Sequence, residues 1–298
     1  MPSVSSLDEA AAALAAAQAE GRQVRIGDDL MAAGLNRILE HDPGDLTCTV
    51  EAGVRLSELR AALAASGQRL SVDPPGDPTI GALLARNLSG PLRHRFGAPR
   101  DLVLGTTLVL ADGTIASAGG KVVKNVAGYD LAPRLRLQGR LALIGRASFR
   151  LHPAPSATRT LVVETEDAPD VAAWLLRSQL QPSALDVLHP GRVAVLFEGS
   201  ERAVAVQLAA AQASVGGTES DAAVWQESRE RQASARGRLR FAPGDLANVL
   251  DELDEAVVRP APGVAYVPEP TADELDASTS RLFDAIRAQL DPQGVLAA

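Results

Sequence analysis

Short runs that alternate between strand-like and helix-like periodicity cover most of this chain, and they constrain its fold more than any other feature. Residues 46–50 alternate apolar and polar side chains, which is typical of a strand with one buried face. Leu56, Leu59 and Leu63 instead recur at helical spacing, and Gly67 marks the expected helix end. This irregular alternation predicts an α+β fold, with a mostly antiparallel sheet that carries helices on one face.

Two domains are expected, because 298 residues exceed the usual size of one domain. Pro153 and Pro155 interrupt the chain where its composition changes, so we place the boundary between residues 153 and 154. In residues 1–153 we expect helices at 6–18, 56–67 and 79–87, and strands at 24–26, 46–50, 102–110 and 149–151. In residues 154–298 we expect strands at 160–164, 184–188, 193–197, 239–241 and 263–267, and helices at 171–180, 202–213, 246–257 and from the capping box at 271–274 onward.

Composition excludes several classes of protein. The apolar content of 46% is enough for a full core, and the net charge of −8 argues against a nucleic-acid protein. No run approaches the roughly 20 apolar residues of a membrane span, and the start of the chain does not resemble a signal peptide. The single cysteine, Cys48, excludes an internal disulfide. We therefore expect a cytoplasmic protein.

Other common catalytic patterns are missing. The four histidines, His41, His94, His152 and His189, are scattered without metal-ligand spacing, so no metal site is predicted. The sequence also lacks the Gly-x-Ser-x-Gly elbow of hydrolases and both the P-loop and Gly-x-Gly-x-x-Gly phosphate motifs.

The informative stretch runs from residue 73 to residue 130. Thr79 can cap a helix, and Gly81 follows it, so the free backbone N–H groups of the first turn predict an anion site. Gly90 would let a ligand approach the backbone. The arginines at 86, 93, 95 and 100 form a positive island with no acidic residue between them, suited to phosphate or a substrate carboxylate. A helix cap beside a solvated arginine loop is the alternative interpretation.

Lys121 and Lys124 are the only two lysines among 29 basic residues. Their spacing indicates either contact with an anion or a partner's acidic surface, or simply a solvated hairpin edge.

The order of residues in this stretch resembles the FAD-binding domain shared by vanillyl-alcohol oxidase and p-cresol methylhydroxylase. The family's Thr-Ile-Gly-Gly turn, Asn-x-x-Gly and (Tyr/Phe)-Gly-x-x-x-Asp-x-Val segment correspond to residues 79–82, 87–90 and 96–103. The run GGKVVKNVAGYDL at residues 119–131 is similar to the FAD-binding (E) subunit of glycolate oxidase. Residues 41–47 and 50–54 are similar to the same subunit, so the resemblance covers roughly residues 36–155.

This resemblance implies an FAD-binding domain of two small α+β subdomains at residues 1–153, followed by a smaller α+β cap at residues 154–298. It also implies a non-covalently held FAD and an FAD-dependent oxidoreductase subunit that passes electrons during oxidation of a short 2-hydroxy acid. The implied partners are a second flavin subunit and an iron–sulfur subunit. The residues that the resemblance assigns to the cofactor are Pro75, Thr79, Ile80, Gly81, Ala82, Asn87, Gly90, Arg95, Gly97, Asp101 and Ile144. No residue is assigned as a catalytic base.

Three departures from the family pattern support an alternative. The glycine-rich first pyrophosphate loop is replaced by a shorter turn that carries Asp28 and Asp29, and one such carboxylate about 4 Å from a phosphate costs about 1 kcal/mol in water. The segment at residues 139–145 is shortened, and Ala82 replaces the second glycine of the turn. The alternative is a degenerate, flavin-free subunit that keeps the fold and contacts its partners through residues 121–131.

Overall fold

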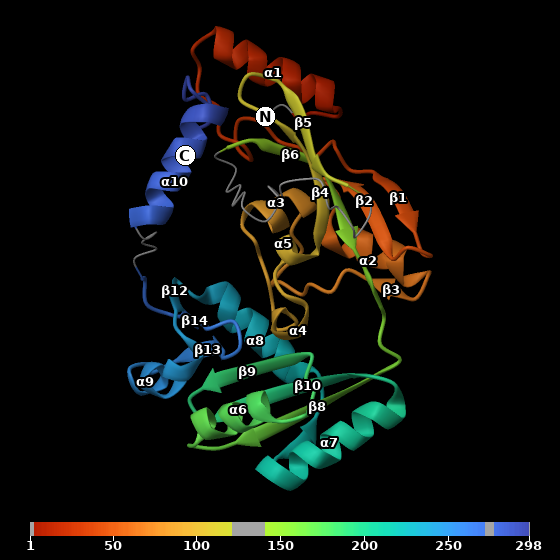
Figure 1. The fold of residues 1–298 in the computed structure, drawn as a ribbon, viewed down its shortest axis with the longest axis vertical. Helices are drawn as coiled ribbons and strands as arrows, with labels where there is room; N and C mark the ends of the chain where they lie inside the picture. The colour runs from red at the N-terminus through yellow and green to blue at the C-terminus, as the bar shows by residue number, and fades with distance from the viewer. Residues whose placement is uncertain (1–2, 121–140, 272–276, 298) are drawn as a thin grey trace.

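Two antiparallel sheets organise the chain in the computed structural model, which describes residues 3–120, 141–271 and 277–297. A five-stranded sheet of order β1-β2-β6-β4-β5 uses residues 38–150, and a seven-stranded sheet of order β11-β8-β10-β9-β13-β14-β12 uses residues 157–267. The two sheets lie at opposite ends of the long axis of the molecule (Figure 1). The predicted α+β class is confirmed, and we call residues 157–271 the cap.

The five-stranded sheet packs its inner face on short helices. Its strands are β1 (Ile38–Asp42), β2 (Thr47–Glu51), β4 (Val103–Val109), β5 (Ile115–Gly119) and β6 (Leu143–Arg150), and β3 (Gln68–Arg69) pairs separately with β7 (His152–Pro153). The helices of this part are α1 (Leu7–Ala19), α2 (Leu56–Ala64), α3 (Ile80–Ala85), α4 (Arg93–Phe96) and α5 (Pro99–Leu102). Cys48, Val50 and Phe149 of the sheet meet Leu59 and Ile80 in one fully buried apolar cluster, which anchors α2 and α3.

The cap sheet carries helices on both faces. Its strands are β8 (Ala157–Glu164), β9 (Ala184–His189), β10 (Arg192–Gly199), β11 (Thr218–Ser220), β12 (Gly237–Arg240), β13 (Ala256–Arg259) and β14 (Val264–Val267). The helices α6 (Ala168–Arg177), α7 (Glu201–Val215) and α9 (Leu246–Asp251), the last preceded by the short 3-10 helix η1 (Pro243–Asp245), share one buried core with the sheet. Helix α8 (Ala223–Ser234) packs Val224 and Trp225 on the opposite face. The prediction of helices on a single face is therefore wrong for α8.

The last part of the chain returns to the first. Helix α10 (Ala277–Leu290) lies beside the five-stranded part rather than on the cap (Figure 1). Val24 donates its N–H to the carbonyl of Val295 at 2.7 Å, and Ala297 donates to the carbonyl of Val24 at 2.9 Å. Val295 and Leu296 are buried with Leu14 of α1. This segment was expected in the second domain, but it packs against residues of the first.

Two expected elements differ. The helix expected at residues 246–257 ends at Asp251, because Val257 and Val258 pair in strand β13 with both β9 and β14. The strand expected at residues 24–26 is reduced to two isolated bridges. The capping box at residues 271–274 lies largely outside the described residues. Among the helices described, none is long and apolar enough to cross a membrane.

Candidate functional site

The start of α3, predicted as an open anion site, is closed by the chain itself. Ile80 donates its N–H to the carbonyl of Val54 at 2.9 Å, and Gly81 donates to the carbonyl of Ala52 at 2.7 Å. The next amide, of Ala82, donates to the capping Oγ1 of Thr79 at 3.3 Å. A Cβ at Gly81 would lie 3.2 Å from Ala52, so the glycine allows this packing. The prediction that these amides are free to bind a diphosphate is wrong.

The turn that replaces the first pyrophosphate loop is closed in the same way. Gly27 donates its N–H to the carbonyl of Leu30, and Asp28 and Asp29 donate theirs to the carbonyl of Arg25. The Asp29 carboxylate accepts the Arg25 N–H at 2.8 Å, and Asp28 lies 3.7 Å from the Arg25 guanidinium. The two carboxylates therefore stabilise a compact turn whose amides already have partners.

Asn87, Gly97 and Asp101 shape the loop around α4 and α5. Asn87 accepts the Arg100 N–H at 3.5 Å, and Asp101 accepts the Ala98 N–H at 2.8 Å. Gly97 ends α4 with a φ of +80°, in the region that favours glycine. These residues hold the backbone between Asn87 and Asp101, and their contacts are with the chain itself.

Gly90 is required by a backbone contact. A Cβ at this position would lie 1.8 Å from the carbonyl oxygen of Asp73, which no relaxation of a side chain can relieve. The position that a side chain at residue 90 would take is thus occupied by the segment that contains Asp73.

The other three predicted cofactor residues lie in different surroundings. Pro75 lines an open pocket of about 460 Å³ together with Arg60 and Arg229. Arg95 donates to the carbonyl of Gln181 in the cap at 3.3 Å. Ile144 is buried beside apolar side chains of α10. Among the described residues, these three therefore have different neighbours.

Asp73 lies between the five-stranded part and the cap and contacts residues of both. Its Oδ1 accepts the Leu92 N–H at 3.0 Å, and its Oδ2 lies 3.8 Å from the guanidinium of Arg229 on α8. Burial raises the pKa of Asp73 to about 7, against the lowering effect of Arg259 and Arg229. The Asp73 carboxyl, which titrates near neutrality, lines two pockets: the pocket of about 460 Å³ that Pro75 also lines, and a second pocket of about 420 Å³.

A buried network ties the cap to the predicted cofactor segment. Arg259 and Asp186 are fully buried, with Nε and Oδ1 separated by 3.3 Å, and Ser228 donates to the second oxygen of Asp186. Arg259 also donates to Gln232 at 2.8 Å, and Gln232 donates to the carbonyl of Ser89 at 2.8 Å. This chain of bonds positions the turn that Ser89 forms with Gly90.

A second ion pair joins the two parts at the other side of the interface. Arg69 makes two hydrogen bonds of 2.6 Å to the Glu198 carboxylate, and its guanidinium lies 5.2 Å from the ring centre of Phe96. The Phe96 ring in turn contacts His152, with 4.8 Å between ring centres. These contacts, the Asp73–Arg229 pair and the bond from Gln232 to Ser89 all join the two parts of the chain.

Sequence reasoning missed Asp186, Arg259 and the role of Asp73. A signal was present, because Asp186 and Arg259 are single charged residues inside apolar strands that read ALDVLH and AVVR. A charge in such a run predicts a buried pair. Lys121 and Lys124, like the rest of residues 121–131, lie outside the described residues.

The comparisons with known proteins concern an FAD binding domain within the chain and the fold of the whole chain. Residues 29–119 match the family model described as an FAD binding domain. The resemblance predicted from the sequence is confirmed. A solved structure of alkyldihydroxyacetonephosphate synthase, 14% identical, superposes with a TM-score of 0.73 over 98% of this chain and 74% of that chain, and so has the same fold.

Two curated relatives are similar in sequence. The chain is 36% identical over 205 residues to glycolate oxidase subunit GlcE of Escherichia coli (strain K12), and this alignment covers 65% of the chain and 56% of that protein. It is 33% identical over 169 residues to glycolate oxidase subunit GlcD of Bacillus subtilis (strain 168), which covers 54% of this chain and 36% of that protein. The chain thus spans between about a third and just over half of these relatives.

FAD is supported by the family match, but the groups predicted to hold its diphosphate do not fit that role. The amides at Thr79–Ala82, predicted to hold the diphosphate, have internal partners, and so do those of the turn with Asp28 and Asp29 that replaces the family's first pyrophosphate loop. The family's cofactor is therefore not assigned to these turns.

Proposed function

We propose that the chain is the FAD-binding subunit of a glycolate-oxidase-like complex that oxidises a short 2-hydroxy acid. The observation that carries this proposal is the match of residues 29–119 to the FAD binding domain, together with 36% identity to GlcE over 205 residues. When bound, FAD supplies the electron-transfer chemistry that amino-acid side chains lack. In this proposal the partners are a second flavin subunit and an iron–sulfur subunit, which also provide any contact with a membrane.

The second candidate function is a flavin-free subunit that stabilises such a complex. The closed turns at Gly27 and Thr79 favour it, because neither offers free N–H groups to a diphosphate. In this case the chain would keep the fold and the partner contacts while another subunit carries the flavin.

Flavin binding by the purified chain separates the two candidates. The visible absorption of the purified protein is recorded first, and the chain, stripped of any flavin, is then titrated with FAD while flavin fluorescence is followed. We expect saturable binding of one FAD per chain. A colourless protein that shows no saturable response to FAD would reject the first candidate and support the second.

FMN and riboflavin are the matched control ligands, because they share the flavin ring but lack the adenylate half. If FAD, FMN and riboflavin bind equally well, no phosphate group is held, in agreement with the closed diphosphate turns. A much tighter binding of FAD would show that other groups of the chain hold the diphosphate.

The proposed partners are tested separately. A tagged chain, produced together with the reading frames that neighbour its own, should retain a second flavoprotein and a protein with iron–sulfur absorption. Recovery of the tagged chain alone under these conditions would contradict the proposed complex.

A further inference from the structure

Helix α8 is an element through which the cap meets the five-stranded part. It packs on the cap sheet from the face opposite α6, α7 and α9, on the side of the cap that is nearest the five-stranded part (Figure 1). Its side chains therefore bond in two directions, to the cap sheet and to residues 73–92. If the cap moves, the weaker of these two sets of bonds breaks.

The bonds from α8 to the cap sheet are buried. Ser228 donates to the carboxylate of Asp186, and both residues are fully buried. The indole N–H of Trp225 donates to Oγ1 of Thr160 at 2.9 Å, again between buried side chains. Breaking either bond would leave a buried polar group without its partner, which is costly.

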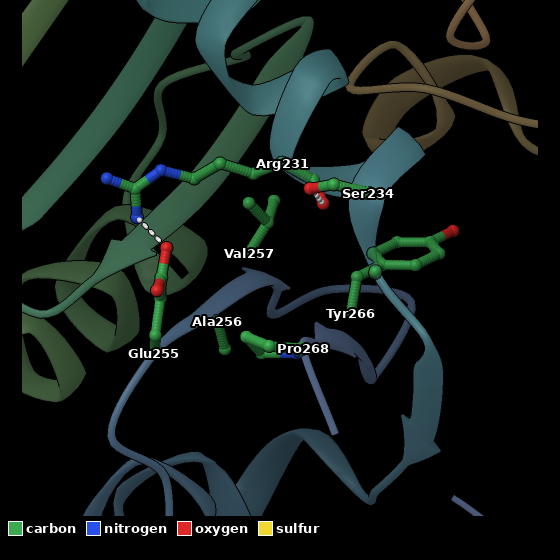
Figure 2. Close-up of a pocket in the computed structure, with 8 residues that line it drawn as sticks. Arg231, Ser234, Glu255, Ala256, Val257, Tyr266 and Pro268 are labelled. Carbon is green, nitrogen blue, oxygen red and sulfur yellow. Dashed lines mark hydrogen bonds and ion pairs between the residues drawn. The ribbon is translucent and has the colours of Figure 1, made fainter. Parts of the chain in front are cut away.

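Arg231 adds a third connection between α8 and the cap sheet. Figure 2 shows its side chain reaching Glu255, at a distance of 3.6 Å, and it also donates to the carbonyl of His189 at 3.3 Å. The pocket left beside the ring of Tyr266, between the helix and the strands, has a volume of only about 30 Å³. Helix α8 is thus packed closely on the cap sheet and moves with it.

The bonds from α8 to the five-stranded part lie beside open pockets. Gln232 donates to the carbonyl of Ser89 at 2.8 Å, and the Arg229 guanidinium lies 3.8 Å from Oδ2 of Asp73, which is beyond hydrogen-bond distance. Asp73 and Arg229 both line the pocket of about 420 Å³ and the pocket of about 460 Å³. This long ion pair is therefore part of the wall that the two pockets share.

Charged groups from four elements face Asp73. Arg229 of α8, Arg60 of α2 and Arg259 of β13 are positive, and Asp186 of β9 is negative. Burial raises the pKa of Asp73 to about 7 and Asp186 adds to this rise, whereas Arg259 and Arg229 lower it. The other charged side chains that line the two pockets are Arg159, Glu198, Glu219, Asp221 and Glu230. The position of Asp73 in the closed interface thus favours its neutral form.

We propose that Asp73 is a proton-controlled latch between the cap and the five-stranded part. With the carboxyl neutral, α8 stays closed on residues 73–92. When the carboxyl ionises, its burial becomes costly, so α8 and the cap move away, Asp73 is hydrated and the two pockets join in one cleft. Opening therefore releases a proton to water and closing takes one up. The latch works in the same way under either function proposed above.

A thiol at position 89 can measure this opening. Ser89 is buried and its carbonyl is bonded by Gln232, so Ser89→Cys places a thiol of similar size at the interface with α8. Cys48, the single native cysteine, lies in the core of the five-stranded part and is the internal control, because only unfolding exposes it. Modification of each thiol by a dithiodipyridine reagent is followed by mass spectrometry of peptides from pH 5 to pH 8. Each rate is divided by the rate for the urea-unfolded chain at the same pH.

We expect the thiol at position 89 to react faster than Cys48. Its corrected rate should rise by about 10- to 100-fold from pH 5 to pH 8, the effect of a carboxyl whose pKa is about 7 when the cap is closed and about 4 when hydrated. Asp73→Asn, which cannot ionise, should abolish this rise, and Asp45→Asn, at an exposed turn, is the matched control and should keep it. Arg229→Gln should shift the rise to higher pH, because a charge that lowers the pKa of Asp73 is removed.

Three outcomes would overturn the proposal. Equal corrected rates for the two thiols would show that position 89 is exposed only by global unfolding. A rise with pH that persists in Asp73→Asn, or that stays at the same pH in Arg229→Gln, would show that Asp73 does not control the opening. Circular dichroism checks that each variant is folded, and the comparison of the two thiols within the Ser89→Cys chain does not depend on the other variants.

Discussion

Replacing Asp186 by Asn would leave the Arg259 guanidinium charged inside the cap without its carboxylate. Both side chains are fully buried, and the amide would keep the shape and the contact with Ser228. Removing one partner of a buried ion pair costs about 3–5 kcal/mol of unfolding free energy. Asp73 can compensate in part, because its ionisation is favoured by the Arg259 charge. We therefore expect a loss of about 3 kcal/mol at pH 8 and a larger loss at pH 5, where Asp73 is protonated.

Tryptophan fluorescence during urea unfolding measures this loss in the cap itself. The two tryptophans of the chain, Trp174 and Trp225, lie on α6 and α8, so the signal reports the unfolding of the cap. A loss of about 3 kcal/mol should lower the urea midpoint by about 1–3 M.

Two controls isolate the effect of the unpaired charge. The double variant Asp186→Asn/Arg259→Met removes both charges and should recover most of the stability. The exposed pair of Arg22 and Glu20 is the matched surface control, and Glu20→Gln should cost less than about 1 kcal/mol. If Asp186→Asn costs no more than Glu20→Gln, the reasoning from burial is refuted.

Three further predictions concern single side chains. Because burial raises the pKa of Asp73 to about 7, the folded chain retains a proton that the unfolded chain loses near pH 4, so the unfolding free energy should fall as pH rises from about 4 to about 7. Asp73→Asn should remove this part of the pH dependence, and an unchanged pH profile of the unfolding free energy in this variant would contradict the raised pKa of Asp73. Thr79→Ala removes the hydrogen bond that caps α3 through the Ala82 N–H, and it should lower the unfolding free energy by about 1 kcal/mol without changing the affinity for FAD. Weaker binding of FAD by this variant in a titration would instead support a diphosphate site at Thr79. Burial raises the pKa of the Cys48 thiol to about 12, so a thiol reagent should modify it only after unfolding, and rapid modification of the native protein would contradict its burial.

The fold was predictable where a local pattern determines it. Ser6 caps α1 through a bond from the Glu9 N–H, as the capping box predicts, and Cys48 points into the core as the alternation in its strand predicts. The prediction of a helix up to residue 257 failed, because the pairing of β13 with β9 and β14 outweighed the local helix propensity. That pairing depends on segments distant in the sequence, which a local pattern does not reveal.

The start of the helix at Thr79 was predictable from the sequence, but the hydrogen-bond partners of its amides were not. The motif residues around Thr79 do begin a helix, yet the carbonyls of Ala52 and Val54 that occupy its amides belong to an earlier segment. Likewise, Arg95 was visible as part of a positive island, while the carbonyl of Gln181 that it contacts belongs to the cap. Contacts between segments far apart in sequence decide which polar groups remain available.

The bonds of Val24 with Val295 and with Ala297 make the cap an insertion rather than an appendage. The chain leaves the five-stranded part after β7 and comes back to it with α10, so two tethers hold the inserted domain. A domain with two connections can rotate about the line that joins them, but it cannot separate from the rest of the chain. Any separation of the cap from the five-stranded part is then a hinge motion, and the ion pairs that it breaks form again between the same residues when the two parts close.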